Sequence, residues 1–250
     1  MIDLSGKTIL VTGASRGIGT GIARACAAAG GKIILHYSAS DTAARQLAHG
    51  LGAACAGLVQ ADLSDPKAAA KLWAKAEALA PRIDVLINNA AIFVEAPLDS
   101  ADDDWLKAWE RTMAVDLTAP ALLSKAAIAH FKAKGGGKII NVASRAGHRG
   151  DDPAMAAYAA AKGGLLALTK TIARGLAGDG IIAYAIAPGW VDTDMAPQDD
   201  ASRANALRDV PLGRMATPDE IGALAAFLAS DLCTSATGAT FDVNGASYVR

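Results

Sequence analysis

Short runs of β-branched and aliphatic residues alternate along this 250-residue chain with longer, alanine-rich segments of helical period. The runs that predict strands are 8–11, 32–36, 57–60, 83–87, 138–142, 181–186 and 240–243. The segments that predict helices are 17–30, 41–51, 66–80, 102–132, 154–178 and 218–230. Several strand runs are apolar on both faces, as in parallel strands covered by helices. The alternation therefore predicts a doubly wound α/β sheet.

The composition supports one well-packed domain. Hydrophobic residues make up 52% of the chain and charged residues 20%, which excludes a disordered protein. We find no internal repeat, low-complexity linker or composition break, so residues 1–250 are expected to form a single domain. Residues 189–217 contain prolines, acidic residues and only a short helical stretch after a strand end, and they are expected to form a flap over a site.

Charge and cysteine content narrow the partners and the compartment. The net charge of −1 gives no basic field for nucleic acid or a membrane surface. The first residues are not expected to form a signal peptide, and no uninterrupted apolar run approaches the length of a bilayer. The three cysteines lack metal-binding spacing, so no metal site is expected. We expect a cytoplasmic protein without a nucleic-acid or membrane partner.

The first predicted strand runs directly into a glycine-rich turn, TGASRGIG, at residues 12–19. Glycines allow a tight turn and let the backbone approach a pyrophosphate, and a helix N-terminus then offers free N–H groups to it. The spacing is GxxxGxG, not the dehydrogenase pattern GxGxxG. The residues of this turn expected to contact a dinucleotide are Gly13, Ser15, Arg16, Gly17, Ile18 and Gly19.

A tyrosine and a lysine stand four residues apart in the stretch AMAAYAAAKGG, residues 154–164. At this spacing Tyr158 and Lys162 share one helix face, and the small residues around them are expected to leave room for a cofactor. A phenol has a pKa of about 10, and moving it toward 7 requires about 4 kcal/mol. One ammonium about 4 Å away supplies roughly that amount at an effective dielectric near 20. Tyr158 is therefore predicted to act as general acid/base, with Lys162 lowering its pKa; alternatively, the two are unrelated surface residues.

The full set of motifs resembles the classical short-chain dehydrogenase/reductase family over essentially the whole chain. These motifs are TGASRGIG, Asp62 after the third strand, Asn88-Asn89-Ala90-Ala91, Ser144, Tyr158-xxx-Lys162 and Pro188-Gly189 followed by Thr193. In style they are most similar to 3-oxoacyl-carrier-protein reductases and related carbonyl reductases. The resemblance implies a three-layer doubly wound Rossmann fold with a seven-stranded parallel sheet. It also implies a homotetramer, with a dimer as the alternative, joined through the helices predicted at 102–132 and 154–178.

The resemblance also implies roles for individual residues. Ser144 would hold the substrate oxygen, and Asp62 would accept from the adenine amino group, or alternatively cap the next helix. Asn89 and Ala90 would lie along the ribose. The remaining cofactor contacts that the resemblance implies are Val191 and Thr193 at the nicotinamide carboxamide, and Ser38, Leu63, Pro188 and Gly189.

Cofactor choice depends on the end of the second strand. NAD-dependent enzymes usually place an acidic residue there for the ribose 2′-hydroxyl. This chain reads His36-Tyr37-Ser38, with no carboxylate before Asp41, and Arg16 in the glycine turn suits a 2′-phosphate. We predict a preference for NADP(H), with NAD(H) as the alternative, in which case Arg16 is only a solvated loop residue.

Asp116 departs from the family pattern, since similar proteins carry asparagine at this place and use it in a proton relay. An ionised Asp116 would pair with Lys162 and offset part of its effect on Tyr158, whereas a protonated one would imitate the amide. We predict that Asp116 keeps its catalytic role in the relay and shifts the pH optimum.

The substrate is less constrained by the sequence. Candidate pocket residues are Ile92, Phe93, residues 145–155, Trp190 and Met195. His148 would contact a substrate oxygen or, alternatively, be exposed; Arg145 and Arg149 would recognise an acid or be neutralised by Asp151 and Asp152. Carrier-protein reductases tend to have basic residues where this chain has Gly135-Gly136-Gly137 and Asp179, which favours a small free carbonyl or alcohol.

Three functions remain open at this point. The leading one is an NADP-dependent oxidoreductase that interconverts a ketone and a secondary alcohol. The second is an NAD-linked alcohol or sugar dehydrogenase. The third is a nucleotide-sensing regulator, against which the retained Ser144, Tyr158 and Lys162 argue.

Overall fold

The computed structural model describes all 250 residues and is built on one seven-stranded parallel sheet. The strand order is β3-β2-β1-β4-β5-β6-β7. The strands are β1 (Thr8–Val11), β2 (Lys32–Tyr37), β3 (Cys55–Gln60), β4 (Val85–Asn88), β5 (Gly137–Val142), β6 (Ile181–Pro188) and β7 (Thr240–Val243). The order reverses between β1 and β4, and this switch point opens a crevice at the carboxyl ends of the strands. The predicted seven-stranded, doubly wound fold is confirmed.

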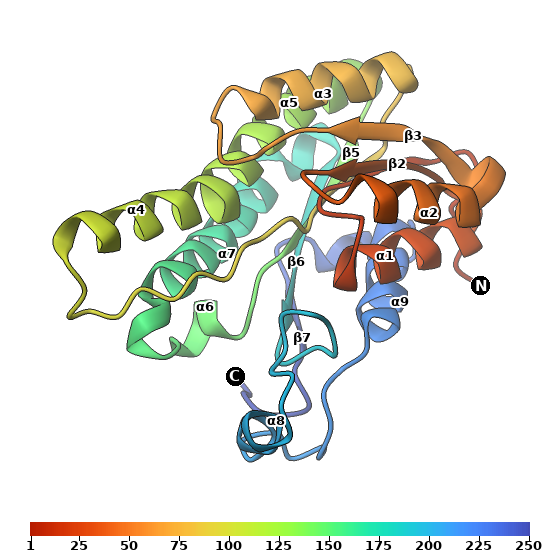
Figure 1. Cartoon of the computed structure of the whole chain (residues 1–250). Helices are drawn as coiled ribbons and strands as arrows, with labels where there is room; N and C mark the ends of the chain where they lie inside the picture. The colour runs from red at the N-terminus through yellow and green to blue at the C-terminus, as the bar shows by residue number, and fades with distance from the viewer.

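Helices cover both faces of the sheet (Figure 1). They are α1 (Gly17–Ala28), α2 (Asp41–Leu51), α3 (Ala68–Leu79), α4 (Asp102–Met113), α5 (Ala119–Lys134), α6 (Ala146–Arg149), α7 (Ala156–Leu176), α8 (Asp200–Leu207) and α9 (Pro218–Ala229). One apolar cluster joins α1, α2 and α9 to the sheet, and a second joins α3, α5 and α7. The alternating pattern of the sequence thus becomes three layers, with the central strands buried from both sides.

The segment predicted as one helix over 102–132 is interrupted in the structure. Residues Ala114–Thr118 form a π turn between α4 and α5. Pro120 has no N–H to donate to the Asp116 carbonyl one turn earlier, so the regular ladder breaks at this point. The insertion changes the direction of the side chains that follow, and Asp116 lies within it. The short helix α6 was not predicted either, whereas α8 is the short helical stretch expected within 189–217.

The alanine- and glycine-rich start of α7 serves helix packing. Only Tyr158 and Lys162 of this helix line the large cavity described below. A Cβ atom on Gly164 would lie 2.8 Å from Leu117 in the π turn, and one on Gly163 would lie 3.3 Å from the Gly147 carbonyl oxygen in α6. We expected these small residues to make room for a cofactor. The structure instead shows that they let α6 and the π turn approach α7.

By length and composition alone, the helical stretch Asp102–Lys134 is long and apolar enough to cross a membrane. Its most apolar window has a mean hydropathy of 1.2 and is 44% buried inside the protein. Most of its buried residues lie in α5, which packs its Leu123, Ala127 and Phe131 into the core. Buried core helices of this kind pass the same test.

Candidate active site

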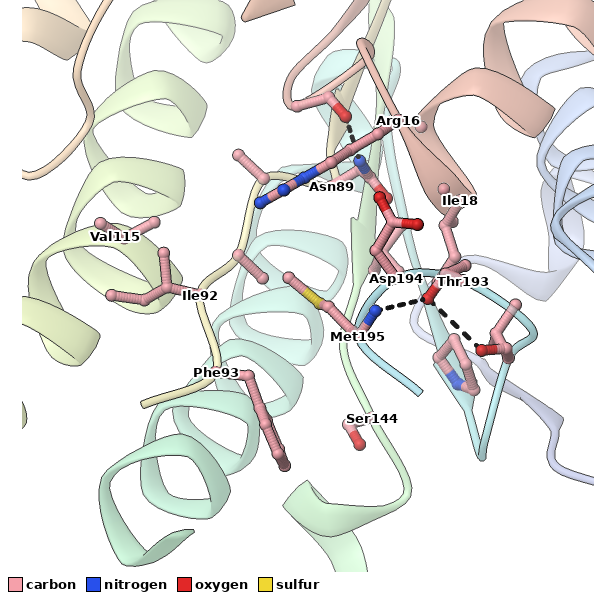
Figure 2. A pocket seen from close by; sticks show the side chains of 18 of the residues that line it. Arg16, Ile18, Asn89, Ile92, Phe93, Val115, Ser144, Thr193, Asp194 and Met195 are labelled. Carbon is pink, nitrogen blue, oxygen red and sulfur yellow. Dashed lines mark hydrogen bonds between the residues drawn. The ribbon is translucent and has the colours of Figure 1, made fainter. Parts of the chain in front are cut away.

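A cavity of about 570 Å³ lies at the carboxyl ends of the strands, at the switch point. It is lined by every residue predicted above as a cofactor contact, and by Ser144. Asp116 does not reach the cavity. Lining residues that the sequence reasoning did not assign to the site include His36, Ala39, Ser40, Ser64, Arg111, Val115 and Asp194. Figure 2 shows Arg16 and Asn89 toward one end of the cavity, and Phe93 and Ser144 toward the other.

The glycine turn has the shape that a pyrophosphate needs. Gly13 has φ +62°, and a Cβ atom on Gly19 would lie 2.1 Å from the Gly13 carbonyl oxygen, so neither position accepts a side chain. The Asn89 amide donates to the carbonyl oxygens of Thr12 (2.9 Å) and Gly13 (3.1 Å) and holds the turn (Figure 2). The N-terminus of α1 has no side-chain cap and no acidic residue in its first turn. Its free N–H groups and positive dipole fit a phosphate anion.

His36 joins the ends of two strands to this turn, a role that the sequence reasoning missed. Its Nδ1 accepts from the Gly13 backbone N–H at 3.1 Å, and its Nε2 lies 3.1 Å from the Ala61 carbonyl oxygen. Burial lowers the pKa of His36 to about 4, so the ring is neutral at neutral pH. A neutral ring with Nε2–H donating to Ala61 satisfies both contacts. Only the fold reveals this, because the partners are 23 and 25 residues away.

Asp62 lines the cavity, but it does not cap the next helix. Its carboxylate accepts from the backbone N–H (3.0 Å) and the hydroxyl (2.8 Å) of Ser64. The Ser64 backbone N–H is the main cause of its lowered pKa. The helix α3 begins only at Ala68, with Lys67 at the N-cap position. The alternative prediction of an N-cap at Asp62 is wrong, because a tight turn separates it from the helix.

At the end of β2, where the cofactor is expected to be selected, other side chains bind the Asp41 carboxylate and Arg16 forms no ion pair. Arg16 is exposed and extends across the cavity opening (Figure 2). Asp41 does not line the cavity. Its carboxylate accepts from the Tyr37 hydroxyl at 2.6 Å and from Arg45 at 2.7 Å, which holds it at the start of α2.

Three side chains meet at the other end of the cavity. Ser144 follows β5, whereas Tyr158 and Lys162 come from consecutive turns of α7. The Lys162 Nζ atom lies 5.5 Å from the centre of the Tyr158 ring and donates to the Val142 carbonyl oxygen at 3.1 Å. Phe93 packs edge-on against the tyrosine with ring centres 5.1 Å apart. The predicted trio is therefore assembled in one place.

The pKa of Tyr158 is raised above its ordinary value, which corrects the prediction of a net lowering. Burial of the phenol is the main cause and outweighs the favourable charge of Lys162. The negative charge of Asp116 adds to the increase, while Ser144 and Lys162 oppose it. In the protein without cofactor, Lys162 therefore limits the rise in the pKa and does not reverse it.

Asp116 lies behind Lys162, inside the protein. Its side chain is fully buried, Oδ1 accepts from the Ile92 backbone N–H at 2.9 Å, and Oδ2 lies 3.4 Å from Lys162 Nζ. Burial raises the pKa of Asp116, and Lys162 opposes that rise. The predicted contact between the two residues is present. Asp116 acts on the site through Lys162, because it does not touch the cavity.

Comparison with known proteins agrees with this geometry. A family model described as enoyl-(acyl carrier protein) reductase matches residues 13–246. The 3-oxoacyl-acyl-carrier-protein reductase FabG of Escherichia coli is 38% identical over 249 residues, covering 99% of this chain and all of the relative. The chain belongs to the short-chain dehydrogenase/reductase family. This membership confirms the prediction of an oxidoreductase that acts on CH–OH and C=O groups.

Two further relatives extend the comparison. D-beta-hydroxybutyrate dehydrogenase of Cupriavidus necator is 35% identical, over 97% of this chain and 98% of the relative. A short chain dehydrogenase from Burkholderia cenocepacia, solved in complex with NADP, superposes with a TM-score of 0.91 at 33% identity. That match covers 98% of both chains. The likeness spans the whole of this short-chain dehydrogenase/reductase, including both ends of its cavity.

The substrate side of this dehydrogenase/reductase matches the sequence reasoning only in part. The predicted residues Ile92, Phe93, Trp190 and Met195 line the cavity, but of residues 145–155 only Arg145 and Asp151 do. His148 neither reaches the cavity nor lies exposed: it is half-buried, and its ring stacks on Tyr248 with centres 5.6 Å apart. Both alternatives for His148 are wrong, because the C-terminal segment folds back over α6.

The two arginines near Ser144 have different surroundings. Arg149 lies 3.9 Å from Asp209, not from Asp151 or Asp152. Asp152 instead accepts from the Ala154 backbone N–H and caps a short turn. Arg145 is buried, lines the cavity and forms no ion pair. The alternative in which Asp151 and Asp152 neutralise both arginines is therefore wrong, because neither aspartate forms an ion pair with them.

The segment predicted as a flap is anchored at its base. A backbone bridge joins Val191 to Ala216, and the Arg203 side chain donates to Asp192 at 2.7 Å. Residues 193–196 border the cavity, whereas none of the residues of α8 line it. Gly189, Trp190 and Val191 at the start of the segment line the cavity as well, so the part that touches the site ends at residue 196.

Proposed function

We propose that this protein is an NADP(H)-dependent carbonyl reductase that interconverts a small ketone and a secondary alcohol. The observation that carries the proposal is the convergence of Ser144, Tyr158 and Lys162 at one end of a cavity. The other end of the same cavity is a side-chain-free glycine turn at a helix N-terminus. A dinucleotide needs both ends, one for its pyrophosphate and one for its nicotinamide.

Each catalytic residue has a task that its position supports. When bound, the nicotinamide supplies a hydride to the carbonyl carbon, and the oxygen then needs one proton. The Tyr158 hydroxyl, which is protonated at neutral pH, donates that proton. Ser144 donates a hydrogen bond to the same oxygen and orients it. Lys162 stabilises the phenolate that remains and keeps its own position through Val142 and Asp116.

A preference for NADP(H) is supported by the charges at the entrance. Arg16 is a free guanidinium beside the glycine turn, and guanidinium groups bind phosphates with two parallel hydrogen bonds. The only carboxylate close after β2, Asp41, is held by Tyr37 and Arg45. NADP is also the molecule bound in the Burkholderia cenocepacia relative.

A small free substrate fits the charges at the edge of the sheet better than a carrier protein does. Of the lysines around the glycine run 135–137, Lys132 is paired with Asp179 at 2.7 Å and Lys138 with Asp231 at 2.8 Å, which leaves Lys134 as the one exposed lysine without an ion pair. An acidic carrier protein needs an unpaired basic surface. Phe93 and Met195 supply apolar walls on the side of the cavity that holds Ser144 (Figure 2), and Ile92 also lines the cavity.

We further propose that residues 1–250 act as one cytoplasmic domain that assembles as a homotetramer, with 193–196 as the closing part of the flap. In α4 only Thr112 is buried, while Trp105 and Trp109 stack on each other with ring centres 5.1 Å apart. Leu106 between them is 48% exposed. Helix faces of this kind usually pack against a second copy. Light scattering on the purified protein, with a Trp105→Glu variant, measures this assembly.

Oxidation of NADPH, followed with a panel of small ketones, tests the proposed function. The wild type should turn over at least one ketone, and Tyr158→Phe should reduce kcat by about 10²–10⁴-fold while still binding NADPH. Full activity in Tyr158→Phe would refute the mechanism. Turnover with NADH alone would favour the sugar or alcohol dehydrogenase, and cofactor binding without turnover of any carbonyl or alcohol would favour the sensor.

A further inference from the structure

Arg145, the residue after Ser144, is a buried cation without a protein partner. Only 7% of the residue is exposed, and it lines the cavity. Its Nη1 atom is buried and has no hydrogen-bond acceptor, and no carboxylate forms an ion pair with it. A guanidinium carries five N–H donors, and burying it without acceptors is strongly unfavourable. The folded protein therefore keeps an unpaired charge beside its catalytic serine.

The charges around Arg145 do not supply the missing partner. Arg149 repels it, and burial together with this repulsion lowers the pKa of Arg145. Asp151 and Asp209 attract it, but neither is within ion-pair distance, and Asp209 lies 3.9 Å from Arg149 instead. An anion that enters the cavity would pair with the part of the guanidinium that lines it, which has no protein acceptor.

The backbone fixes Arg145 at the place where a substrate has to lie. Its N–H donates to the Pro188 carbonyl oxygen at 2.9 Å, which continues the pairing between β5 and β6 beyond the end of β5. Ser144, its neighbour, is the residue that orients the carbonyl oxygen in the proposed function. A cation held next to Ser144 can recognise a charge only a few bonds from the reacting carbonyl.

We propose that Arg145 binds the carboxylate of the substrate, so that the substrates are small oxo acids and the corresponding hydroxy acids. This inference rests on the proposed function and narrows its substrate class. The carboxylate is not changed in the reaction: the carbonyl carbon gains a hydride, its oxygen gains a proton, and the acid group stays ionised and paired with Arg145. The planar fork of an arginine matches the two oxygens of a carboxylate.

The test compares acetoacetate with methyl acetoacetate, which has the same ketone and no negative charge. The measured quantity is the ratio of kcat/KM for the acid to that for the ester, with NADPH as cofactor. The wild type should favour the acid, and Arg145→Met should lower the ratio by about tenfold or more. Arg145→Lys should fall between the two, because an ammonium keeps the charge and loses the fork.

Arg149→Met is the matched control. It removes the same charge one helical turn away, from a residue that does not line the cavity. The ratio should stay within about twofold of the wild type, because a half-exposed charge has a small effect. Equal losses in the two variants, or no preference for the acid in the wild type, would overturn the proposal. A preference for dihydroxyacetone phosphate over acetoacetate would overturn the assignment to carboxylates.

Binding of butyrate, which has a carboxylate and no reducible carbonyl, separates this inference from the proposed function. Isothermal titration calorimetry should detect butyrate binding to the wild type and to Tyr158→Phe, but not to Arg145→Met. If butyrate binds through Arg145 while no ketone is reduced, the proposed function fails and the anion site stands. If neutral ketones are reduced and butyrate does not bind, the anion site fails and the reductase stands.

Discussion

The Nζ atom of Lys162 lies 3.4 Å from Oδ2 of Asp116, and both side chains are buried. The positive charge of Lys162 therefore acts on two groups at once, the phenol of Tyr158 and the carboxylate of Asp116. The lysine stabilises the phenolate form of Tyr158 on the cavity side, and its charge is balanced by a carboxylate on the protein side. The effective charge that Tyr158 experiences is set by this pair and not by Lys162 alone.

Replacing Asp116 by asparagine should move the pH–rate profile of ketone reduction to lower pH. Asp116 raises the pKa of Tyr158, so its neutral isostere lowers that pKa, and the activity that needs the protonated phenol falls off earlier as pH rises. We expect the profile to move in this direction with reduction still catalysed. Steady-state kcat values for ketone reduction, measured over about pH 5 to 10, test this shift.

The control for this variant is Asp103→Asn, which removes an equal charge from the exposed first turn of α4. Its profile should coincide with that of the wild type, since exposed charges are screened by solvent. An unchanged profile in Asp116→Asn would remove Asp116 from the proton-transfer machinery.

Replacing Arg16 by alanine should weaken binding of NADPH more than binding of NADH. A charged hydrogen bond to a phosphate contributes about 1.5–3 kcal/mol, so the KM for NADPH should rise about 10- to 100-fold. The KM for NADH should change little, because that cofactor has no 2′-phosphate. Arg24→Ala, on the exposed side of α1, serves as control. A parallel increase for both cofactors would indicate a structural role for Arg16.

His36 should make the fold sensitive to acid. The unfolded chain takes up the proton at a pKa near 6.5, whereas the native His36 takes it up only near 4. The stabilisation is therefore complete above pH 6.5 and is lost as the pH falls toward 4, by about 3 kcal/mol in the free energy of unfolding. The same protonation removes the acceptor for the Gly13 N–H and should weaken cofactor binding.

Urea denaturation of the wild type and of His36→Gln measures this effect. The pH should run from about 4 to 7.5, which covers the titration of His36 in the folded and unfolded chains. The variant should lose roughly 3 kcal/mol less than the wild type over that range. His49→Gln, an exposed histidine on α2, should behave like the wild type. Identical acid sensitivity in all three proteins would show that other groups cause it.

Two glycine-to-alanine substitutions should have opposite effects. In Gly19→Ala the new Cβ atom would lie 2.1 Å from the Gly13 carbonyl oxygen and 2.7 Å from the Asn89 amide, so the turn must move. We expect loss of cofactor binding by fluorescence titration and a lower melting temperature. Gly50→Ala in α2 meets no atom within 4 Å and should stabilise the protein by about 0.5–1 kcal/mol. Unimpaired binding in Gly19→Ala would contradict the assignment of the phosphate site.

The sequence by itself determined the sheet, the order of its elements and the two ends of the site. Strands and helices are set by patterns within about ten residues, which is why β1 and β7 have the predicted bounds. Tyr158 and Lys162 share a face for the same local reason, and the glycine turn follows directly from the first strand.

Only the tertiary structure decided which charged and titratable groups meet, and how burial shifts their pKa values. Lys162 meets Asp116, and His36 meets Gly13, across 46 and 23 residues of chain. The direction in which burial shifts the pKa of Tyr158 also depended on neighbours that only packing supplies. Likewise, Arg145 is left unpaired while Arg149 approaches Asp209 and His148 stacks on Tyr248. Desolvation and ion pairing depend on distances between segments remote in sequence, and no local pattern encodes those distances.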